Sequence, residues 1–189
     1  MNASSNYFNV NEERIKSGIN SNRYLQFLGM EKRFPNGLTI HVKERIPAAC
    51  INYIGIKYII ADDGMVLETT KRADIENSLA LISGLEIQDI NVGSMPQVRK
   101  SSQMAACVQL LQELIMQGVI NNTKSISFAD GGIYLSTRNG FTVNLGTGDY
   151  LRAKIGTVRG VLAELGKQGI SNGIIEATVP GEATYRPEN

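Results

Sequence analysis

The dipeptide Asn139-Gly140 constrains the fold of this chain more than any other feature of its sequence. Asn-Gly between two strand-like runs is the strongest short-range signal for a β-hairpin. Apolar and polar residues alternate on both sides of it, over residues 133–138 and 141–145. We therefore predict an antiparallel hairpin here, preceded by a third strand over residues 125–129.

Two amphipathic helices are predicted to flank these three strands. The first covers residues 101–117, with Ser101 or Ser102 as its N-cap and Gly118 at its end; the second runs from Asp149 to about Lys167. Apolar residues recur at helical spacing in both, namely Met104, Cys107, Val108, Leu111, Leu114 and Ile115 in the first and Leu151, Ile155, Val158, Leu162 and Leu165 in the second. Together with shorter strands on either side, this order predicts an α+β domain with a mainly antiparallel sheet.

The start of the chain has a different pattern. A short helix over residues 12–17, capped by Asn11 and ended by Gly18, is followed by strands over residues 24–34 and 38–43. One helix and two strands bury too little surface to form a core of their own. Residues 44–47 (Glu-Arg-Ile-Pro) break the pattern and indicate a junction, so we expect one domain over residues 1–46 and another over residues 47–189. The second domain should open with strands over residues 49–54, 57–61 and 65–68.

Composition excludes several classes of function. The 189 residues carry 19 basic and 18 acidic side chains, a net charge of +1, whereas a nucleic-acid binder needs a basic excess. No apolar run approaches the roughly 20 residues that span a bilayer. Residues 1–6 are polar, so they resemble a cut end more than a signal peptide. Cys50 and Cys107 are predicted to be buried and unbonded, although a disulfide between them is conceivable outside the cytoplasm.

No motif indicates catalysis or metal binding, and we expect no cofactor. His41 is the only histidine and lies on the polar side of a predicted strand. Asp62-Asp63 precedes Gly64 and is predicted to be a turn, as is the segment 130–132, Asp-Gly-Gly. The segment 146–149, Gly-Thr-Gly-Asp, leads into a helix and could offer amides to an anion, but it lacks the glycine pattern of a phosphate loop. The sequence therefore favours a binding protein over an enzyme.

Several stretches, in order, resemble the FtsQ/DivIB family of bacterial division proteins. Residues 33–49, RFPNGLTIHVKERIPAA, resemble the end of that family's POTRA domain, and residues 60–67, IADDGMVL, resemble the hairpin that opens its β domain. Residues 79–85, LALISGL, match a later segment, with Ala80 in place of the usual proline. Two more similarities lie near the end, at residues 139–154 and at residues 173–176, where Glu176 replaces an aspartate.

The resemblance implies a non-enzymatic scaffold. In that family an extracytoplasmic POTRA domain and β domain follow a single membrane helix, and the β domain docks the bitopic proteins FtsL and FtsB (DivIC) to help control septal peptidoglycan synthesis. The membrane helix and the first POTRA strand and helix have no counterpart in this sequence, so the chain resembles a truncated soluble fragment of a protein anchored in the cell membrane at the septum. A POTRA-type transport or chaperone module and a cell-wall-binding domain are the alternatives.

Two sets of functional residues follow from this interpretation. The first is a partner-binding edge at the end of the chain, where a strand over residues 174–179, a Pro180-Gly181 turn and a last strand over residues 183–186 would accept a strand of FtsB; its residues are Thr178, Val179, Gly181, Ala183, Thr184, Tyr185 and Arg186. Tyr185 would be an aromatic anchor for the partner, with Lys154 and Arg159 nearby as charges or as solvated residues. A frayed tail is the alternative. The second set, Glu44, Arg45 and Pro47, would form an interdomain hinge, unless Glu44 and Arg45 are simply solvated.

Overall fold

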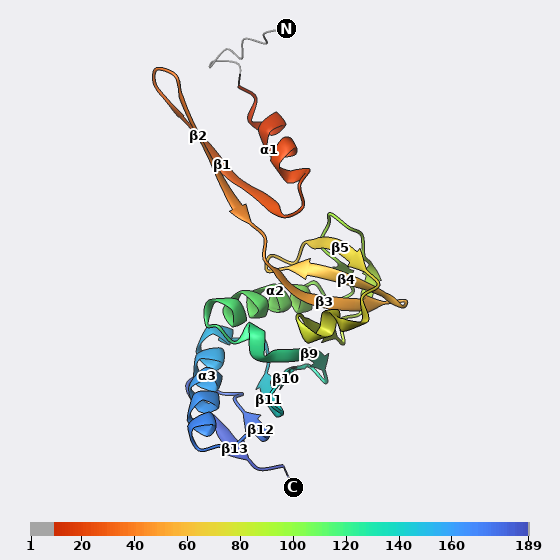
Figure 1. Ribbon diagram of the computed structural model, residues 1–189, viewed down its shortest axis with the longest axis vertical. Coiled ribbons are helices and arrows are strands. Elements are labelled where there is room, and N and C mark those ends of the chain that lie inside the picture. The colour runs from red at the N-terminus through yellow and green to blue at the C-terminus, as the bar shows by residue number, and fades with distance from the viewer. Residues whose placement is uncertain (1–9, 189) are drawn as a thin grey trace. The chain divides into compact units, whose positions relative to one another are not determined.

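The structure, a computed structural model, describes residues 10–188 of the chain. Contacts within the chain divide it into two compact units, Met1–Ile46 and Pro47–Asn189, which we call unit 1 and unit 2 (Figure 1). The division falls at the peptide between Ile46 and Pro47. The polar residues 1–6 lie outside the described part of the chain.

Unit 1 begins with a helix that is longer than predicted. α1 (Glu12–Asn20) starts after Asn11, whose side chain accepts a hydrogen bond from the N–H of Arg14, so the predicted N-cap is confirmed. The predicted end at Gly18 is wrong. The helix continues to Asn20 because Ser21 closes it, donating its N–H to the Ser17 carbonyl and its hydroxyl to the Gly18 carbonyl.

The rest of unit 1 is a hairpin. β1 (Leu25–Arg33) and β2 (Gly37–Glu44) pair antiparallel across the predicted turn. Among its described residues, unit 1 contains no buried apolar side chain, and Leu38, Ile40 and Val42 remain 38%, 39% and 49% exposed. The expectation that this segment cannot bury a core of its own is confirmed.

Arg45 closes the base of the hairpin. Its side chain is buried, and its Nη1 donates to the carbonyls of Arg23 (3.2 Å) and Leu25 (2.6 Å), while its N–H donates to the Tyr24 carbonyl. The alternative that Arg45 is a solvated surface charge is therefore wrong, because the guanidinium is used to hold the connection between α1 and β1. Glu44 is exposed.

The hinge role of Glu44, Arg45 and Pro47 stays a prediction. We expect Pro47→Gly to broaden the range of arrangements of the two units, because glycine removes the restriction that proline places on its own φ and on the preceding residue. Small-angle scattering should give a broader interdomain distance distribution for Pro47→Gly than for the wild type. Pro180→Gly, in an exposed turn of unit 2, is the matched control. An unchanged profile for Pro47→Gly would count against the hinge.

Unit 2 is built on a nine-stranded sheet with the order β13-β12-β11-β10-β9-β6-β3-β4-β5. The pairings β11–β12, β3–β6 and β6–β9 are parallel and the others are antiparallel, so the predicted α+β fold with a mainly antiparallel sheet is confirmed. The strands are β3 (Pro47–Tyr53), β4 (Ile56–Ala61), β5 (Val66–Thr70), β6 (Ala80–Ser83), β9 (Thr123–Ala129), β10 (Gly132–Thr137), β11 (Phe141–Gly146), β12 (Gly173–Glu176) and β13 (Thr184–Arg186). A separate short hairpin consists of β7 (Ile87–Asp89) and β8 (Gln97–Val98).

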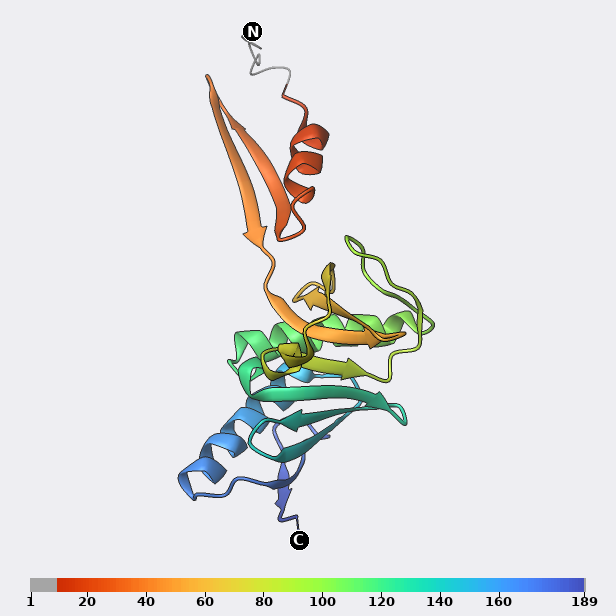
Figure 2. The ribbon, with the colours of Figure 1, turned by 45° about the vertical axis from the view of Figure 1, so that its right-hand side comes forward.

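Two helices pack on this sheet and on each other, α2 (Ser101–Met116) against β3 and α3 (Leu151–Lys167) against β11 (Figure 2). Most residues of the two predicted apolar stripes are buried, and Leu110 joins them. The N-cap prediction for α2 is wrong: Lys100 is the N-cap, without a side-chain bond, and Ser101 already belongs to the helix. Gly118 follows the helix end with a φ of 71°, as predicted. No helix among residues 10–188 is long and apolar enough to cross a membrane.

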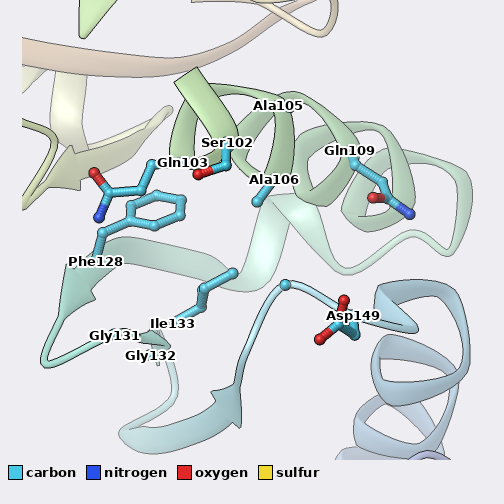
Figure 3. Close-up of a pocket in the computed structure, with 11 residues that line it drawn as sticks. Ser102, Gln103, Ala105, Ala106, Gln109, Phe128, Gly131, Gly132, Ile133 and Asp149 are labelled. Atoms are coloured by element: carbon cyan, nitrogen blue, oxygen red, sulfur yellow. The ribbon is translucent and has the colours of Figure 1, made fainter. Parts of the chain in front are cut away.

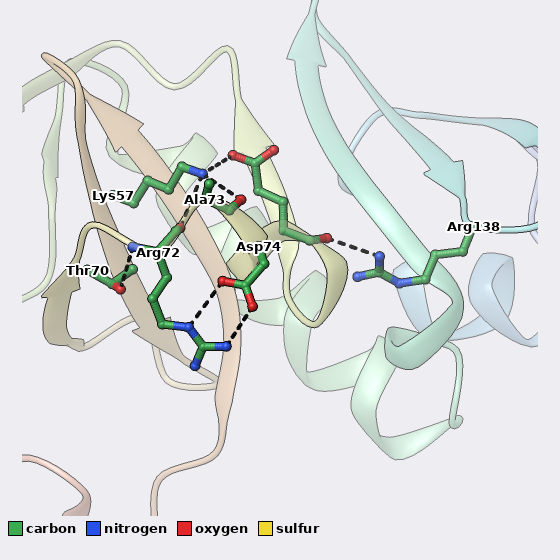
Figure 4. A network of polar contacts seen from close by, with 7 residues as sticks. Lys57, Thr70, Arg72, Ala73, Asp74 and Arg138 are labelled. Atoms are coloured by element: carbon green, nitrogen blue, oxygen red, sulfur yellow. Dashed lines mark hydrogen bonds and ion pairs between the residues drawn. The ribbon is translucent and has the colours of Figure 1, made fainter.

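The connection between β5 and β6 is fixed from two sides. It contains the 3₁₀ turn η2 (Ala73–Asn77), and Lys57 from β4 pairs with Glu76 at 2.8 Å and donates to the Ala73 carbonyl. Arg138, which follows β10, donates to the Glu76 carbonyl at 3.0 Å (Figure 4). These contacts hold the crossover that places β6 between β3 and β9.

Cys50 and Cys107 are both fully buried and unbonded, as predicted. Burial raises the pKa of the Cys50 thiol to about 11 and that of the Cys107 thiol to about 12. Since the thiolate is the reactive form of cysteine, neither side chain is a nucleophile near neutral pH.

Candidate partner-binding edge

The end of the chain forms an ordered edge of the sheet. β13 pairs with β12 on one side, and no strand among the described residues pairs with its other side. Gly181 has a φ of 81° and the N–H of Glu182 donates to the Val179 carbonyl, as in the predicted type II turn. The alternative of a frayed tail after Val179 is wrong, because residues 184–186 are a paired strand.

The backbone of Tyr185 presents its polar groups to this open edge. Gly173 is the first residue of β12, and a Cβ atom placed on it would lie 2.6 Å from the carbonyl oxygen of Arg186. That oxygen therefore points towards β12. The N–H and C=O groups of successive residues in a strand point to opposite sides. The N–H and C=O of Tyr185 therefore face away from β12, where an added strand could bond to them.

The other edge of the sheet is partly covered. The N–H of Val66 in β5 donates to the Ser94 carbonyl, and the N–H of Gly93 donates to the Val66 carbonyl. The loop before β8 thus occupies polar groups of the β5 edge, and β13 is the more open of the two edge strands.

Side chains of the predicted site point in two directions. Thr178, Val179, Gly181, Thr184 and Arg186 are exposed, whereas Ala183 and Tyr185 pack against the core. The Tyr185 hydroxyl donates to the Asn172 carbonyl at 3.1 Å, and its ring meets the edge of Phe141 at a centroid distance of 6.4 Å. Tyr185 therefore attaches β13 to the domain.

A polar network crosses the last three strands on the exposed face. Glu176 in β12 accepts a hydrogen bond from Asn144 Nδ2 in β11 at 2.8 Å and pairs with Arg186 in β13 at 3.0 Å. Sequence reasoning missed this function of Glu176 and Asn144, because only the register of β11, β12 and β13 brings them together.

Lys154 is buried, and both of the roles expected for it are wrong. Its side chain is 2% exposed, and its Nζ donates to the carbonyls of Leu145 and Thr147, each at 2.9 Å. Desolvation lowers the pKa of Lys154, and the carboxylate of Asp149 opposes this shift. The ammonium group fixes the connection between β11 and α3. Arg159 is exposed, in agreement with the solvated alternative.

That connection also supports the predicted site. Gly146 has a φ of 61°, and a Cβ atom placed on it would lie 3.2 Å from the Thr178 side chain. Asn144 caps the same turn by accepting a hydrogen bond from the N–H of Gly146 at 2.9 Å. The segment 145–147, whose carbonyls Lys154 holds, therefore lies close to Thr178 at the start of the partner-binding edge.

A hollow of about 390 Å³ lies between α2 and two loops (Figure 3). Its lining includes Ser102, Gln103 and Phe128, the segment 131–133 and Gly148 and Asp149. Asp149 is the only ionisable side chain among the lining residues, and its carboxylate accepts a hydrogen bond from the Thr147 hydroxyl at 3.0 Å. The Asp149 carboxylate would also repel an anion bound at the segment 146–149. In addition, the backbone here directs the carbonyls of Leu145 and Thr147, and not amides, at Lys154.

The remaining candidates are structural. His41 Nε2 lies 3.4 Å from a Glu31 carboxylate oxygen on the exposed hairpin of unit 1. Asp63 accepts a hydrogen bond from the N–H of Met65, which confirms the predicted turn, and Asp130 and Gly131 both have positive φ in another turn. Among residues 10–188, no three histidine, cysteine or acidic side chains are grouped to hold a metal ion.

Comparison with known proteins gives a consistent result. No protein-family model matches the chain. The chain is 27% identical over 191 residues to the cell division protein DivIB of Clostridium botulinum, covering 95% of this chain and 70% of that protein. It is 36% identical over 89 residues to DivIB of Clostridium tetani, covering 47% of this chain and 33% of that protein.

A protein from a different genus carries the other name of the family. The cell division protein FtsQ of Syntrophotalea carbinolica is 28% identical to this chain over 149 residues, covering 77% of this chain and 51% of that protein. The similarities to DivIB and FtsQ proteins together span nearly the whole sequence, in agreement with the motifs of both units. Relatives named DivIB and FtsQ, 27–36% identical to this chain, support its assignment to the FtsQ/DivIB family.

Proposed function

We propose that this protein is a non-catalytic scaffold of the cell-division machinery. Its relatives are named as cell division proteins, and residues 10–188 contain no group of three histidine, cysteine or acidic side chains that could hold a metal ion. In this role it docks bitopic proteins of the FtsL and FtsB (DivIC) type and thereby helps control septal peptidoglycan synthesis.

The open edge at β13 is the observation that carries this proposal. An unpaired strand edge is a template for an extended segment of another chain, which adds to the sheet through backbone hydrogen bonds. The outward N–H and C=O of Tyr185 are the groups that an FtsB-type strand would bind, and the exposed side chains of Thr184 and Arg186 would lie beside it.

Location is part of the same proposal. The matched DivIB of Clostridium botulinum is longer than the region of similarity, which covers 70% of it. We place this chain on the extracytoplasmic side of the cell membrane at the division septum, anchored by a single membrane helix that lies outside these 189 residues.

A pair of variants at Tyr185 tests strand addition. Both Tyr185→Ala and Tyr185→Pro remove the ring, but only proline removes the N–H that faces the open edge, and proline is tolerated at an edge when its missing N–H faced solvent. We expect Tyr185→Pro to bind the ectodomain of the FtsB-type protein at least about tenfold more weakly than Tyr185→Ala, because losing a backbone bond also leaves the partner's carbonyl unpaired. Isothermal titration calorimetry measures both.

Hydrogen exchange on the two free variants is the control for folding, since their exchange in β12 should agree. Equal affinities of Tyr185→Pro and Tyr185→Ala, with both folded, would place the binding site away from this edge.

A further inference from the structure

A hollow of about 470 Å³ adjoins the open edge strand. It lies within the connection from β12 to β13 and is lined by Glu176, Thr178, Val179, Gly181, Glu182, Ala183 and Thr184. Five of these belong to the set predicted to bind a partner from the sequence. A strand that pairs with β13 and continues past Thr184 would pass this hollow, so one of its side chains could enter it.

The lining combines carboxylates with aliphatic groups. Glu182 is exposed and forms no ion pair with another described residue. Glu176 is partly exposed, and its carboxylate already accepts a hydrogen bond from Asn144 and pairs with Arg186. Val179, 50% exposed, and Ala183 supply apolar surface. The hydroxyls of Thr178 and Thr184 add hydrogen-bond acceptors.

The charge of this end of the chain differs from the charge of the whole. Residues 173–188 contain Glu176, Glu182 and Glu188 against the single basic residue Arg186, whereas the entire chain has a net charge of +1. Since Arg186 already pairs with Glu176, the negative charge that faces an incoming strand is centred on Glu182.

We propose that this hollow receives a lysine or arginine side chain of the strand that adds to β13. The inference rests on the proposed function and specifies the chemistry of the partner segment. A long basic side chain fits both parts of the lining, because its methylene groups can cover Val179 and Ala183 while its charged end reaches the carboxylates. The hollow lies at one end of β13, so this contact sets the register of the added strand, which backbone hydrogen bonds alone leave weakly specified.

Charge reversal at Glu182 tests the proposal. We expect Glu182→Lys to weaken binding of the FtsB-type ectodomain by about tenfold or more, because like charges placed together at an interface are strongly unfavourable. Glu182→Gln should weaken it several-fold and make the affinity less dependent on salt. The matched control is Glu68→Lys, an exposed glutamate on β5 at the opposite edge of the sheet. Glu176 is left unchanged, because it also holds β11, β12 and β13 together.

Rescue identifies the partner's side chain. Each lysine and arginine of the partner ectodomain is changed to glutamate, and one such variant should bind Glu182→Lys more tightly than it binds the wild type. Equal affinities of Glu182→Lys, Glu68→Lys and the wild type would overturn the basic contact, as would the absence of any rescuing variant. If Tyr185→Pro still loses binding in that case, strand addition stands without the basic contact; if it binds as Tyr185→Ala does, the proposed function fails as well.

Discussion

Replacing Lys154 with alanine is expected to lower the free energy of unfolding by about 3 kcal/mol or more. The ammonium group donates to two carbonyls, of Leu145 and Thr147, in a site where the side chain is 2% exposed. A buried acceptor that loses its donor costs about 1–3 kcal/mol, and the loss of the methylene stem adds a cavity. Urea unfolding measures the change.

Two further variants separate the hydrogen bonds from the packing. Lys154→Met keeps most of the stem and removes only the donors, so we expect a loss of about 2 kcal/mol. Arg159→Met, on the exposed side of the same helix, should change stability by less than about 0.5 kcal/mol. If Lys154→Met is as stable as Arg159→Met, the two bonds contribute nothing and the buried lysine is only tolerated.

Comparing the wild type with Lys154→Met also predicts how stability depends on pH. Burial lowers the pKa of Lys154 below its usual 10.5, so at a pH between the lowered and the usual value the unfolded chain binds more protons than the folded one. Stability then rises with pH in this window. The cost of burying the charge is fully present below the lowered pKa and disappears as pH approaches 10.5. The advantage of the wild type over Lys154→Met should therefore grow on moving to alkaline pH.

Local signals in the sequence were sufficient for most elements of unit 2. Asn139-Gly140 and Pro180-Gly181 specify their turns through positive φ at the glycines, and helical spacing of apolar residues identified α2 and α3. Such signals act over a few residues, so they are readable without knowledge of the fold.

Long-range pairings had no such signal. The parallel contacts of β6 with β3 and β9 join segments that are far apart in the chain, and nothing in their sequences specifies the neighbour. The burial of Lys154 was missed because its partners are backbone carbonyls, which any residue can supply, and lysine is rarely buried. One signal was present: Lys154 lies between Leu151 and Val158 at helical spacing, inside the apolar stripe of α3.

Gly173→Ala is expected to detach β13 from the sheet and to weaken partner binding strongly. Gly173 has a φ of 134°, a conformation that other residues rarely adopt. A Cβ atom there would lie 2.5 Å from a ring carbon of Tyr185 and 2.6 Å from the carbonyl oxygen of Arg186. Because the second contact is with backbone, the clash is relieved only if β13 moves away. Backbone strain of this kind costs about 1–3 kcal/mol, so most of the domain should stay folded while its edge strand is lost.

Hydrogen exchange and binding together decide this outcome. The amides of Thr184 and Arg186, which face β12, should lose their protection in Gly173→Ala, and the affinity for the FtsB-type ectodomain should fall at least about tenfold, whereas α2 and β9–β11 remain protected. Gly160→Ala is the control, since a Cβ atom placed on Gly160 within α3 meets nothing within 4 Å, and it should raise stability by about 0.5–1 kcal/mol. Should Gly173→Ala release β13 and still bind with the affinity of the wild type, the partner cannot be adding a strand to this edge.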